Sequence, residues 1–370
     1  MTTRVVTFFA NSSWYLYNFR KNTLSSFLKE GYEVHVMAPD NRFFSLLGEL
    51  GCHCRLVALS PRSKNPFREF KSLLSIFRGL NNGGKLVFNF TPKVNIYSSL
   101  ICSFLGINSV NNISGLGRVF NERGLLSLLV INLYWLTNRF TYFTFFQNQD
   151  NYEEFVDRRI ISKNRASVLP GSGVDLKTFS LHDLPHSKTI RFLYCSRILK
   201  PKGVCLLVKA CGELFNKGFD IRLTIAGPID TSDPDCVEMK EIDEWQTRGY
   251  VDFVGEVADS RELIKDSDCV VLPSYYAEGT PKILLEAGAM GRVLITTDTS
   301  GCRDVVVNDN GFLVQARSLE SLTKALTMVS NASKNDLREM GLKSRALIED
   351  QFDEEIVILA YLTKAAELFD

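Results

Sequence analysis

Residues 269–289 read CVVLPSYYAEGTPKILLEAGA, and this stretch decides the class of fold. The apolar run CVVLPS is typical of a buried strand that ends at Pro273, SYYAEGT is a polar loop, and KILLEAGAM has helical spacing. Thr280 is a suitable N-cap and Pro281 suits the first helical position, so we expect the helix to begin there. The stretch therefore predicts the strand, loop and helix of an α/β protein.

The same alternation of strand and helix recurs along the 370 residues. The runs RVVTFFA, FRKNTLSSFLKEG and YEVHVMAP open the chain, and the rhythm starts again at IRFLYCSRI after about twenty residues rich in Gly, Pro, Ser and His. A domain usually holds roughly 100–200 residues, which favours two domains. We predict Rossmann-like domains at 1–170 and 191–350, a linker at 171–190 and a C-terminal helix at 351–370.

The C-terminal helix has one predicted apolar face and two possible positions. In its sequence FDEEIVILAYLTKAAELF, helical spacing places several apolar residues near one face, which must pack against a domain. The helix therefore either closes the second domain or crosses back to the first. The residues expected on that face are Ile356, Leu359, Leu362, Ala366 and Leu368.

Composition indicates an ordinary folded protein of a reducing compartment. The chain is 45% hydrophobic and 23% charged, and its nine cysteines lack the spacing of a disulfide framework. The start MTTRVVTFFA looks like a first strand rather than a signal peptide. The longest apolar run, Leu125–Leu136, is about twelve residues long, whereas a membrane span needs roughly twenty. A buried helix followed by a strand is the simpler interpretation of this run, and a membrane-surface element is the alternative.

Charge is distributed unevenly. The net charge is +1, but residues 1–175 hold 20 Lys+Arg against 11 Asp+Glu, and the remainder holds 23 against 31. Such asymmetry indicates that the first half meets an anionic surface or ligand. Nucleic acid and anionic lipid are both candidates on charge alone.

The loops after two predicted strands carry the candidate chemistry. Glu278 precedes the helix that starts near Pro281, and Glu286 lies inside it, so the helix N-terminus between them could hold a phosphate by backbone contacts. Ionised carboxylates flanking a phosphate suit sugar hydroxyls, to which they make strong hydrogen bonds. Arg197 and Lys202, in the loop SRILKPKG, suit a diphosphate. Spacing alone leaves open that all these are surface charges.

Several motifs together resemble the family-4 retaining glycosyltransferases. They are GSGVD at 171–175, R-x4-K-G at 197–203, AGP at 226–228, VDFVG at 251–255 and EGTPKILLEAGAMG at 278–291. The segments NSSWYLYNFR, FTPKVNIYSS, NNISGLGRVF, FFQNQD and TSGCRDVVVNDNGFLV are similar to the bacterial branch that builds O-antigen, capsule or N-linked glycan units on undecaprenyl diphosphate. That branch includes N-acetylgalactosaminyl- and galactosyltransferases.

The resemblance implies a GT-B fold, in which two Rossmann-like domains face each other and the C-terminal one binds the donor. It implies transfer from a UDP-sugar to a lipid-linked saccharide, with Arg197, Lys202 and Glu278 as catalytic residues and Glu286 on the ribose. The other residues expected at the nucleotide sugar are Gly279, Thr280, Pro281, Lys282, Gly227, Val254, Gly255, Asn11, Ser12 and Ser13. Retention is expected through a front-face displacement in which the leaving phosphate assists deprotonation of the acceptor hydroxyl.

The acceptor side departs from the family, because many relatives place a histidine there and only His35 and His53 lie in the first half. His35, in the strand YEVHVM, is interpreted as a packed strand residue. Asn11, Ser12 and Ser13, and Ser114 with Gly115, are the substitutes. The candidates for an anionic acceptor are Arg20, Lys93, Ser114, Gly115 and Arg118.

The partners expected are a UDP-sugar, a lipid-linked saccharide and an anionic membrane surface, with no nucleic acid. We therefore expect a cytoplasmic protein attached peripherally to the inner face of the plasma membrane. No cofactor and no essential divalent metal are expected, because Cys52-His53-Cys54 lacks ligand spacing and the two D-x-D sequences, at 266–268 and 233–235, suit caps or turns. A UDP-sugar 2-epimerase and a noncatalytic sugar-nucleotide-binding subunit are the alternative functions.

Overall fold

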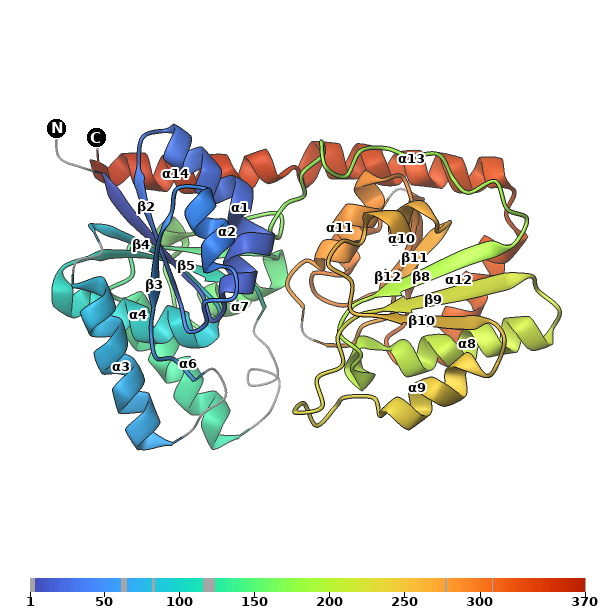
Figure 1. Cartoon of the computed structure of the whole chain (residues 1–370), viewed down its shortest axis with the longest axis horizontal. Coiled ribbons are helices and arrows are strands. Elements are labelled where there is room, and N and C mark those ends of the chain that lie inside the picture. Colours follow the sequence, from blue (N-terminus) through green and yellow to red (C-terminus); the bar gives the residue numbers. More distant parts are fainter. Residues whose placement is uncertain are drawn as a thin grey trace. The chain divides into compact units, whose positions relative to one another are not determined.

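The computed structural model describes residues 4–60, 65–81, 84–115, 124–276, 278–307 and 309–369. The chain divides into two compact units, one formed by Met1–Ser172 with Glu355–Asp370 and the other by Gly173–Glu354. Each unit has its own parallel sheet with helices on both faces, so the predicted α/β class with two Rossmann-like domains is confirmed (Figure 1). Residues 173–189 contain no helix and no strand.

The sheet of the first unit has seven parallel strands in the order β3-β2-β1-β4-β5-β6-β7. The strand order reverses between β1 and β4, and such a reversal opens a crevice at the carboxyl ends of the strands. The strands are β1 (Val5–Phe9), β2 (Glu33–Ala38), β3 (His53–Leu56), β4 (Leu86–Phe90), β5 (Asn108–Ile113), β6 (Phe143–Phe146) and β7 (Ala166–Val168).

Two groups of helices cover the two faces of this sheet. Strand side chains such as Phe8 and Val36 pack with α1, α2 and α14, whereas Phe9 and Met37, which point the other way, pack with α3 and α4. Helix α4 lies between α3 and α6 on that second face (Figure 1). The helices are α1 (Ser13–Lys29), α2 (Phe44–Glu49), α3 (Pro66–Leu80), α4 (Pro92–Leu105), α6 (Leu125–Asn138), α7 (Gln149–Asp157), η1 (Lys163–Arg165) and α14 (Glu354–Phe369).

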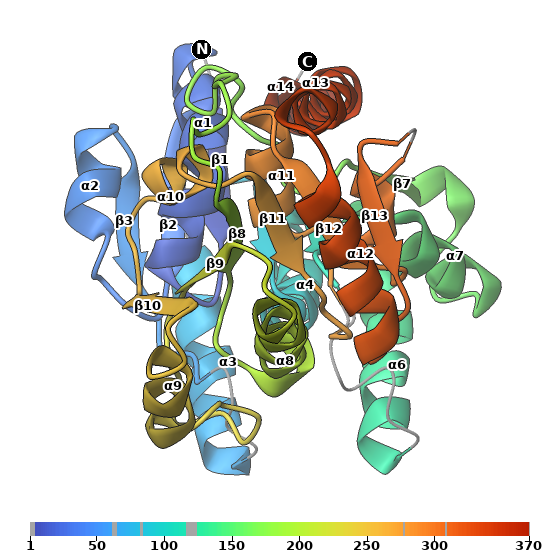
Figure 2. The ribbon, with the colours of Figure 1, turned by 90° about the vertical axis from the view of Figure 1, so that its right-hand side faces the viewer.

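The sheet of the second unit has six parallel strands in the order β10-β9-β8-β11-β12-β13, with its reversal between β8 and β11. The strands are β8 (Ile190–Cys195), β9 (Ile221–Ala226), β10 (Val251–Gly255), β11 (Cys269–Leu272), β12 (Val293–Thr297) and β13 (Gly311–Val314). The helices are η2 (Lys200–Lys202), α8 (Val204–Asn216), α9 (Met239–Gln246), α10 (Arg261–Lys265), α11 (Lys282–Ala289), η3 (Arg303–Val305), α12 (Leu319–Asn331) and α13 (Lys334–Gln351). Figure 2 shows α8 and α12 in front of this sheet.

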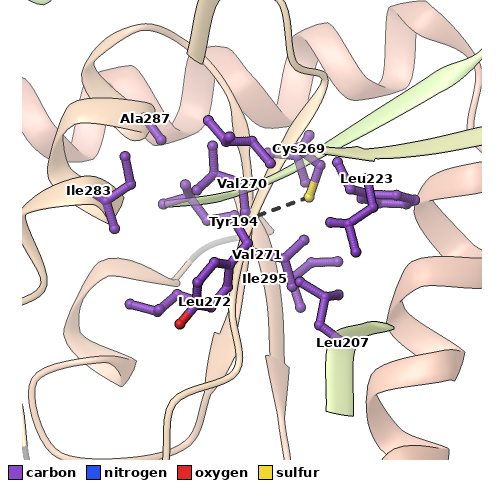
Figure 3. Packing of buried hydrophobic residues seen from close by; sticks show 14 of the residues in the cluster. Tyr194, Leu207, Leu223, Cys269, Val270, Val271, Leu272, Ile283, Ala287 and Ile295 are labelled. Carbon is purple, nitrogen blue, oxygen red and sulfur yellow. Dashed lines mark hydrogen bonds between the residues drawn. The ribbon is translucent and has the colours of Figure 1, made fainter. Parts of the chain in front are cut away.

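Strand β11 is the centre of the second core. Its four residues are all buried, as the apolar run CVVL predicts for a strand covered on both faces. Ile283 and Ala287 of α11 lie on one side of the strand and Leu207 of α8 lies on the other (Figure 3). The loop that follows β11 is therefore held on a rigid support.

The C-terminal helix α14 packs on the first unit, which answers the question of where the chain's last helix goes. Its buried residues are Val357, Ile358, Tyr361 and Ala365, and Tyr361 accepts a hydrogen bond from the Asn112 amide. The predicted apolar face is right only in part, because Leu362 and Leu368 pack against the core whereas Ile356 is 42% exposed and Leu359 is 65% exposed. The sequence is apolar nearly all round here, so spacing did not single out the packed side.

The apolar run 125–136 forms helix α6 with strand β6 after it, as predicted. The expected burial holds for one side of the helix, where Tyr134 is 2% exposed. The other side is open, since Leu128, Leu129, Trp135 and Leu136 are each at least 40% exposed. Among the described residues, no helix combines the length and apolarity that crossing a bilayer requires.

Candidate functional site

Two loops of the second unit meet where its strand order reverses. Residues 196–203 follow β8 and residues 273–281 follow β11, and β8 and β11 are neighbours in the sheet. Because the strands are parallel, both loops leave the same edge. This topology brings Arg197 and Lys202 close to Glu278, although the two loops are far apart in sequence.

Lys202 and Glu278 form a buried ion pair. The Lys202 ammonium donates to Oε1 of Glu278, and the two side chains are only 8% and 12% exposed. The hydroxyl of Ser274 donates to the same oxygen at 3.0 Å. Neither residue is therefore a solvated surface charge, which was the alternative that spacing left open.

A glycine allows the two loops to approach so closely. Gly203 has a φ of +81°, and a Cβ at that position would lie 2.2 Å from the carbonyl oxygen of Pro273. The Tyr275 amide also donates to the Pro201 carbonyl at 2.9 Å. Since the Lys202 loop and the Glu278 loop are joined through their backbones, the ion pair has a fixed geometry.

Aromatic residues surround the cations of this site. The Lys202 ammonium lies 5.2 Å from the ring centre of Tyr276, and the exposed Arg197 guanidinium lies 5.7 Å from it. The buried hydroxyl of Tyr194 donates to the Arg197 carbonyl at 3.0 Å. Burial, together with the nearby charge of Glu278, holds the pKa of Tyr194 well above its usual range, so it stays a neutral donor.

Glu286 is buried, at 9% exposure, on the first turns of α11. Its Oε2 accepts from the Ser260 hydroxyl at 2.9 Å, and Oε1 lies 3.8 Å from the Lys282 ammonium. Burial raises the pKa of Glu286, although Lys282 and Ser260 act in the other direction. The pKa of Cys195 is raised to about 12, first by burial of the thiol and second by the negative charge of Glu286. Glu286 therefore lies near Cys195, the last residue of β8.

The turn between the two glutamates is tightly packed against the loop after β12. Helix α11 begins at Lys282 with Pro281 as its N-cap, so the helix starts one residue later than predicted and Thr280 is not the cap. Gly301 has a φ of +76°, and a Cβ there would lie 1.5 Å from the Gly279 carbonyl oxygen. Only glycine fits at 301, and its loop fixes the position of Gly279.

Gly227 follows β9, the strand next to β8, and Val254 and Gly255 belong to β10, the strand beyond it. The Gly227 amide donates to the Gly255 carbonyl at 2.8 Å, and a Cβ on Gly227 would meet the Ser196 carbonyl oxygen at 1.8 Å. Val254 is 46% exposed on β10. Ser196 directly precedes Arg197, so this contact positions the start of the basic loop.

In the first unit, the residues predicted after β1 act mainly at the start of α1. Ser12 is the N-cap and accepts from the Tyr15 amide at 3.2 Å. The Ser13 amide donates to Asp40 at 2.9 Å and its hydroxyl bonds the same carboxylate. Asn11 lies just before them, at the reversal between β1 and β4.

The predicted acceptor residues of the first unit that the structure describes lie around the carboxyl ends of β4 and β5, which are neighbours in the sheet. Arg20 is buried, with its guanidinium 4.8 Å from the ring centre of Phe90. The Lys93 ammonium pairs with Glu69 at 2.7 Å and donates to the Ser60 carbonyl at 2.7 Å. Two further positions, Ser114 and Gly115, follow β5, whereas Arg118 lies outside the described residues.

Residue Thr91 is a site candidate that the sequence did not reveal. It sits between β4 and α4 at the strand-order reversal, with φ 80° and ψ 145°, a region in which essentially only glycine is found without strain. Its buried hydroxyl has no partner in the described part of the chain. Strained residues of this kind cluster at functional sites. The strain at Thr91 is visible only in its backbone angles, so no sequence motif could have revealed it.

Among the residues with described positions, Glu33, His35 and His53 bring three possible metal-ligating atoms within 4.8 Å of one another. His35 Nε2 lies 2.7 Å from the Glu33 carboxylate, and His35 and His53 are register partners on β2 and β3. Cys54 follows His53 in the strand and so points to the other face. In the D-x-D sequence at 266–268, Asp268 accepts a hydrogen bond from the Arg191 amide at 2.9 Å. In the one at 233–235, Asp233 accepts from the Asp235 amide. Each sequence therefore has a structural role.

Three comparisons place the chain among known proteins. Residues 189–331 match the family described as glycosyl transferases group 1. An N,N'-diacetylbacillosaminyl-diphospho-undecaprenol alpha-1,3-N-acetylgalactosaminyltransferase of Campylobacter jejuni is 25% identical over 96% of each chain. In structure, a glycosyltransferase of Rickettsia africae has a TM-score of 0.80, with 15% identity and 99% of both chains covered.

Anabaena HepE, in complex with UDP-glucose, has a TM-score of 0.79 at 15% identity, covering 98% of this chain and 99% of that one. These structural likenesses extend over both units, as the whole-chain resemblance implies, and the family match covers the unit that holds the Lys202–Glu278 pair. Residues 189–331 therefore match the group 1 glycosyl transferases, and the chain as a whole has the two-domain GT-B fold of these glycosyltransferase structures.

Proposed function

We propose that the protein transfers a hexose or N-acetylhexosamine, with N-acetylgalactosamine as the first choice, from a UDP-sugar to an undecaprenyl-diphosphate-linked saccharide. The buried Lys202–Glu278 pair at the strand-order reversal carries this proposal, because a nearly buried pair on fixed loops is a preorganised charge site. The choice of acceptor and sugar is supported by the name of the Campylobacter jejuni relative. The choice of a UDP donor is supported by the UDP-glucose that HepE binds.

In this proposal the cations of the site bind the donor diphosphate, and its carboxylates bind hydroxyl groups. Lys202 and the exposed Arg197, both beside Tyr276, would neutralise the donor diphosphate. Glu278, fixed by Lys202 and Ser274, would accept a hydrogen bond from a hydroxyl of the transferred sugar. Glu286, fixed by Ser260, would accept from the ribose hydroxyls. Backbone N–H groups of the turn before α11 would bind phosphate oxygens.

The reaction we propose keeps the anomeric configuration. The bond between the anomeric carbon and the diphosphate oxygen breaks, and the acceptor oxygen bonds to that carbon from the same face. The acceptor's hydroxyl proton passes to an oxygen of the leaving UDP. Lys202 and Arg197 stabilise the charge that builds on UDP as the bond breaks. Glu278 serves as a sugar clamp in this scheme, since it is already an acceptor for an ammonium and a hydroxyl.

We also propose that transfer takes place at the inner face of the plasma membrane and needs no divalent metal. Two cations beside the diphosphate supply the positive charge that a metal supplies in other transferases. Turnover should therefore persist when EDTA is added, and loss of turnover that Mg²⁺ or Mn²⁺ restores would contradict this part.

The experiment that tests the function uses purified protein with a panel of UDP-sugars and an undecaprenyl-diphosphate-linked saccharide, with products identified by mass. We expect the acceptor to gain one hexose or N-acetylhexosamine. Conversion of the donor without acceptor would instead indicate an epimerase. Binding of UDP with neither transfer nor donor conversion would indicate a noncatalytic sugar-nucleotide-binding subunit.

A further inference from the structure

Helix α6 is apolar on its exposed side as well as on the side that packs against the first unit. Helical spacing places Leu128, Leu129, Trp135 and Leu136 along one side, and these side chains are 58%, 55%, 40% and 40% exposed. We call this side the apolar face of α6, and Phe140, just beyond the helix, is 56% exposed. A helix that only closed a core would bury these residues. An exposed apolar patch of this kind marks an interaction surface.

The packed side of the same helix carries Tyr134, Val130, Ile131 and Leu133 into a hydrophobic cluster, and it also buries three polar residues. Ser127, Thr137 and Asn138 are 8%, 1% and 2% exposed. Thr137 donates to the Leu133 carbonyl at 2.9 Å, and Asn138 accepts from the Thr144 hydroxyl at 3.0 Å. Because a second set of residues already packs α6 on the first unit, the apolar face of α6 is not needed for that packing.

A basic pocket adjoins the C-terminal end of this apolar face. The hollow measures about 440 Å³, and its described lining residues include four cations and no carboxylate. We define the basic pocket by its residues, which are Trp135, Asn138, Arg139, Val156, Arg159, Ile160, Ile161, Ser162, Lys163 and Arg165. Its walls come from α6, α7 and the segment before β7, and Figure 2 shows α7 beside β7.

The cations of the basic pocket have two roles. The Arg165 guanidinium donates to the Asn138 carbonyl at 2.8 Å and the Arg139 carbonyl at 3.3 Å, so it caps the end of α6. Arg139 lies over the Trp135 ring at 3.9 Å. Within the described ranges, Arg139, Arg159 and Lys163 form no ion pair with a carboxylate, and these three are exposed. They are therefore available to an anionic ligand.

A buried donor also points to a ligand here. The Nδ2 of Asn138 is buried and finds no acceptor among the residues whose positions are described, although Asn138 lines the pocket. A buried amide donor without an acceptor destabilises the fold, and an anion in the pocket would supply that acceptor.

We propose that α6 lies in the surface of an anionic bilayer, with its apolar face among the acyl chains and the basic pocket around a lipid phosphate. A tryptophan between leucines and arginines is the side chain expected at the level of the headgroups. Each Lys or Arg near an anionic surface contributes about 1 kcal/mol. This inference adds a specific contact surface to the proposed membrane attachment. It rests on the proposed function only in taking a membrane as the partner.

The basic pocket is separate from the residues proposed for transfer. Asn138 and Arg139 precede β6, and Arg165 precedes β7, so the pocket lies at the amino ends of these strands. The candidate acceptor positions Ser12, Lys93 and Ser114 follow strands of the same parallel sheet and lie at its opposite edge. Substitutions in the pocket should therefore leave the chemistry intact.

The test measures binding of the full chain to vesicles of phosphatidylcholine alone and of phosphatidylcholine with phosphatidylglycerol. We expect binding to the anionic vesicles. Arg159→Gln with Lys163→Gln should weaken it about 30-fold, from about 1 kcal/mol per cation. Leu128→Ser with Leu129→Ser should weaken it at least about tenfold. Matched controls on exposed positions, Lys209→Gln with Lys217→Gln and Leu359→Ser, should bind as the wild type does.

Unchanged vesicle binding in both α6-region variants would overturn the inference, and so would equal loss in the matched controls. Binding of inorganic phosphate without vesicle binding would also overturn it, because the site would then serve free phosphate. Transfer to an acceptor in detergent separates this inference from the proposed function. It should be unchanged in the pocket variant, and if the wild type binds vesicles but transfers nothing, only the proposed function fails.

Discussion

Lys202 and Glu278 lie 76 residues apart in sequence, yet their side chains form a nearly buried ion pair that Ser274 completes. The pair exists because β8 and β11, whose loops carry the two residues, are neighbours at the reversal of strand order. Removing one partner leaves the other charge buried without compensation, which typically costs about 3–5 kcal/mol.

The first prediction is that the two charges stabilise the fold jointly. Lys202→Met and Glu278→Gln should each lower the free energy of unfolding by about 3 kcal/mol, and the double variant should lose less than the sum because no charge is left unpaired. Urea denaturation measures this. The exposed pair Arg158–Glu154, 2.8 Å apart, is the control, and its coupling should stay below about 1 kcal/mol. Additive losses at 202 and 278 would show that the pair is not formed.

The second prediction concerns pH and Glu286. Burial raises its folded-state pKa above the unfolded value of 4.5, so the folded state binds the proton more tightly. This group's contribution to stability is therefore full below the unfolded pKa and is lost as pH rises through the folded one. Glu286→Gln should remove that loss, giving a variant at least as stable as the wild type at neutral pH but with weaker UDP binding. Thermal melts across the acid range compare the two proteins.

If the wild type instead gained stability as pH rises through this range, relative to Glu286→Gln, the carboxylate would be stabilised by its partners rather than penalised by burial. Ser260→Ala offers a second check, because it removes the hydroxyl donor of Glu286 at 2.9 Å. The pKa of Glu286 should rise further in that variant, so the loss of stability should occur at a higher pH.

The third prediction uses two glycines at the ends of one helix. Gly203 and Gly218 flank α8 with φ values of +81° and +87°, but a Cβ at 203 would meet the Pro273 carbonyl oxygen at 2.2 Å while one at 218 would meet nothing within 4 Å. Gly218→Ala should cost about 1–2 kcal/mol from φ alone. Gly203→Ala should cost clearly more and also weaken UDP binding, because it separates the two loops. Equal costs would mean that the close approach is absent.

The fourth prediction concerns Thr91. Its φ of 80° and ψ of 145° cost about 1–3 kcal/mol for a β-branched residue, and glycine adopts these angles freely. Thr91→Gly should therefore be as stable as the wild type or more so, while its transfer to the acceptor falls. Thr91→Ser, which keeps the hydroxyl, should retain more transfer than Thr91→Gly. A clear loss of stability in Thr91→Gly would show that the residue is held there for packing and not for function.

The sequence predicted the strands, the two domains and the loop chemistry because these depend on local pattern and on short motifs. CVVL is buried on both faces as an all-apolar strand should be, and the loops after β8 and β11 carry the cations and carboxylates expected of them. The direct pairing of Lys202 with Glu278 could not be predicted, since it depends on the strand order of the sheet. The same limit applies to Ser274 and Ser260, whose hydroxyls carry no signal in the sequence.

Apolar periodicity failed where a helix is apolar nearly all round. In α14 it chose Ile356 and Leu359, whereas Val357 and Tyr361 are the packed residues. In α6 it suggested burial, whereas Tyr134 is buried and Leu128 and Leu129 on the other side are exposed. A run of leucines indicates only that a segment is more stable out of water, and either a protein core or a membrane surface can provide that environment.

The most direct test of the central claim is transfer measured by mass with Glu278→Gln as the critical variant. Wild-type protein, given UDP-sugars and an undecaprenyl-diphosphate-linked saccharide, should extend the acceptor by one hexose or N-acetylhexosamine, and Glu278→Gln should bind UDP but lose at least about a hundredfold in transfer, in the range seen when one preorganised electrostatic group is removed. Near-normal transfer by Glu278→Gln, or no extension of the acceptor by the wild type with any UDP-sugar, would contradict the account.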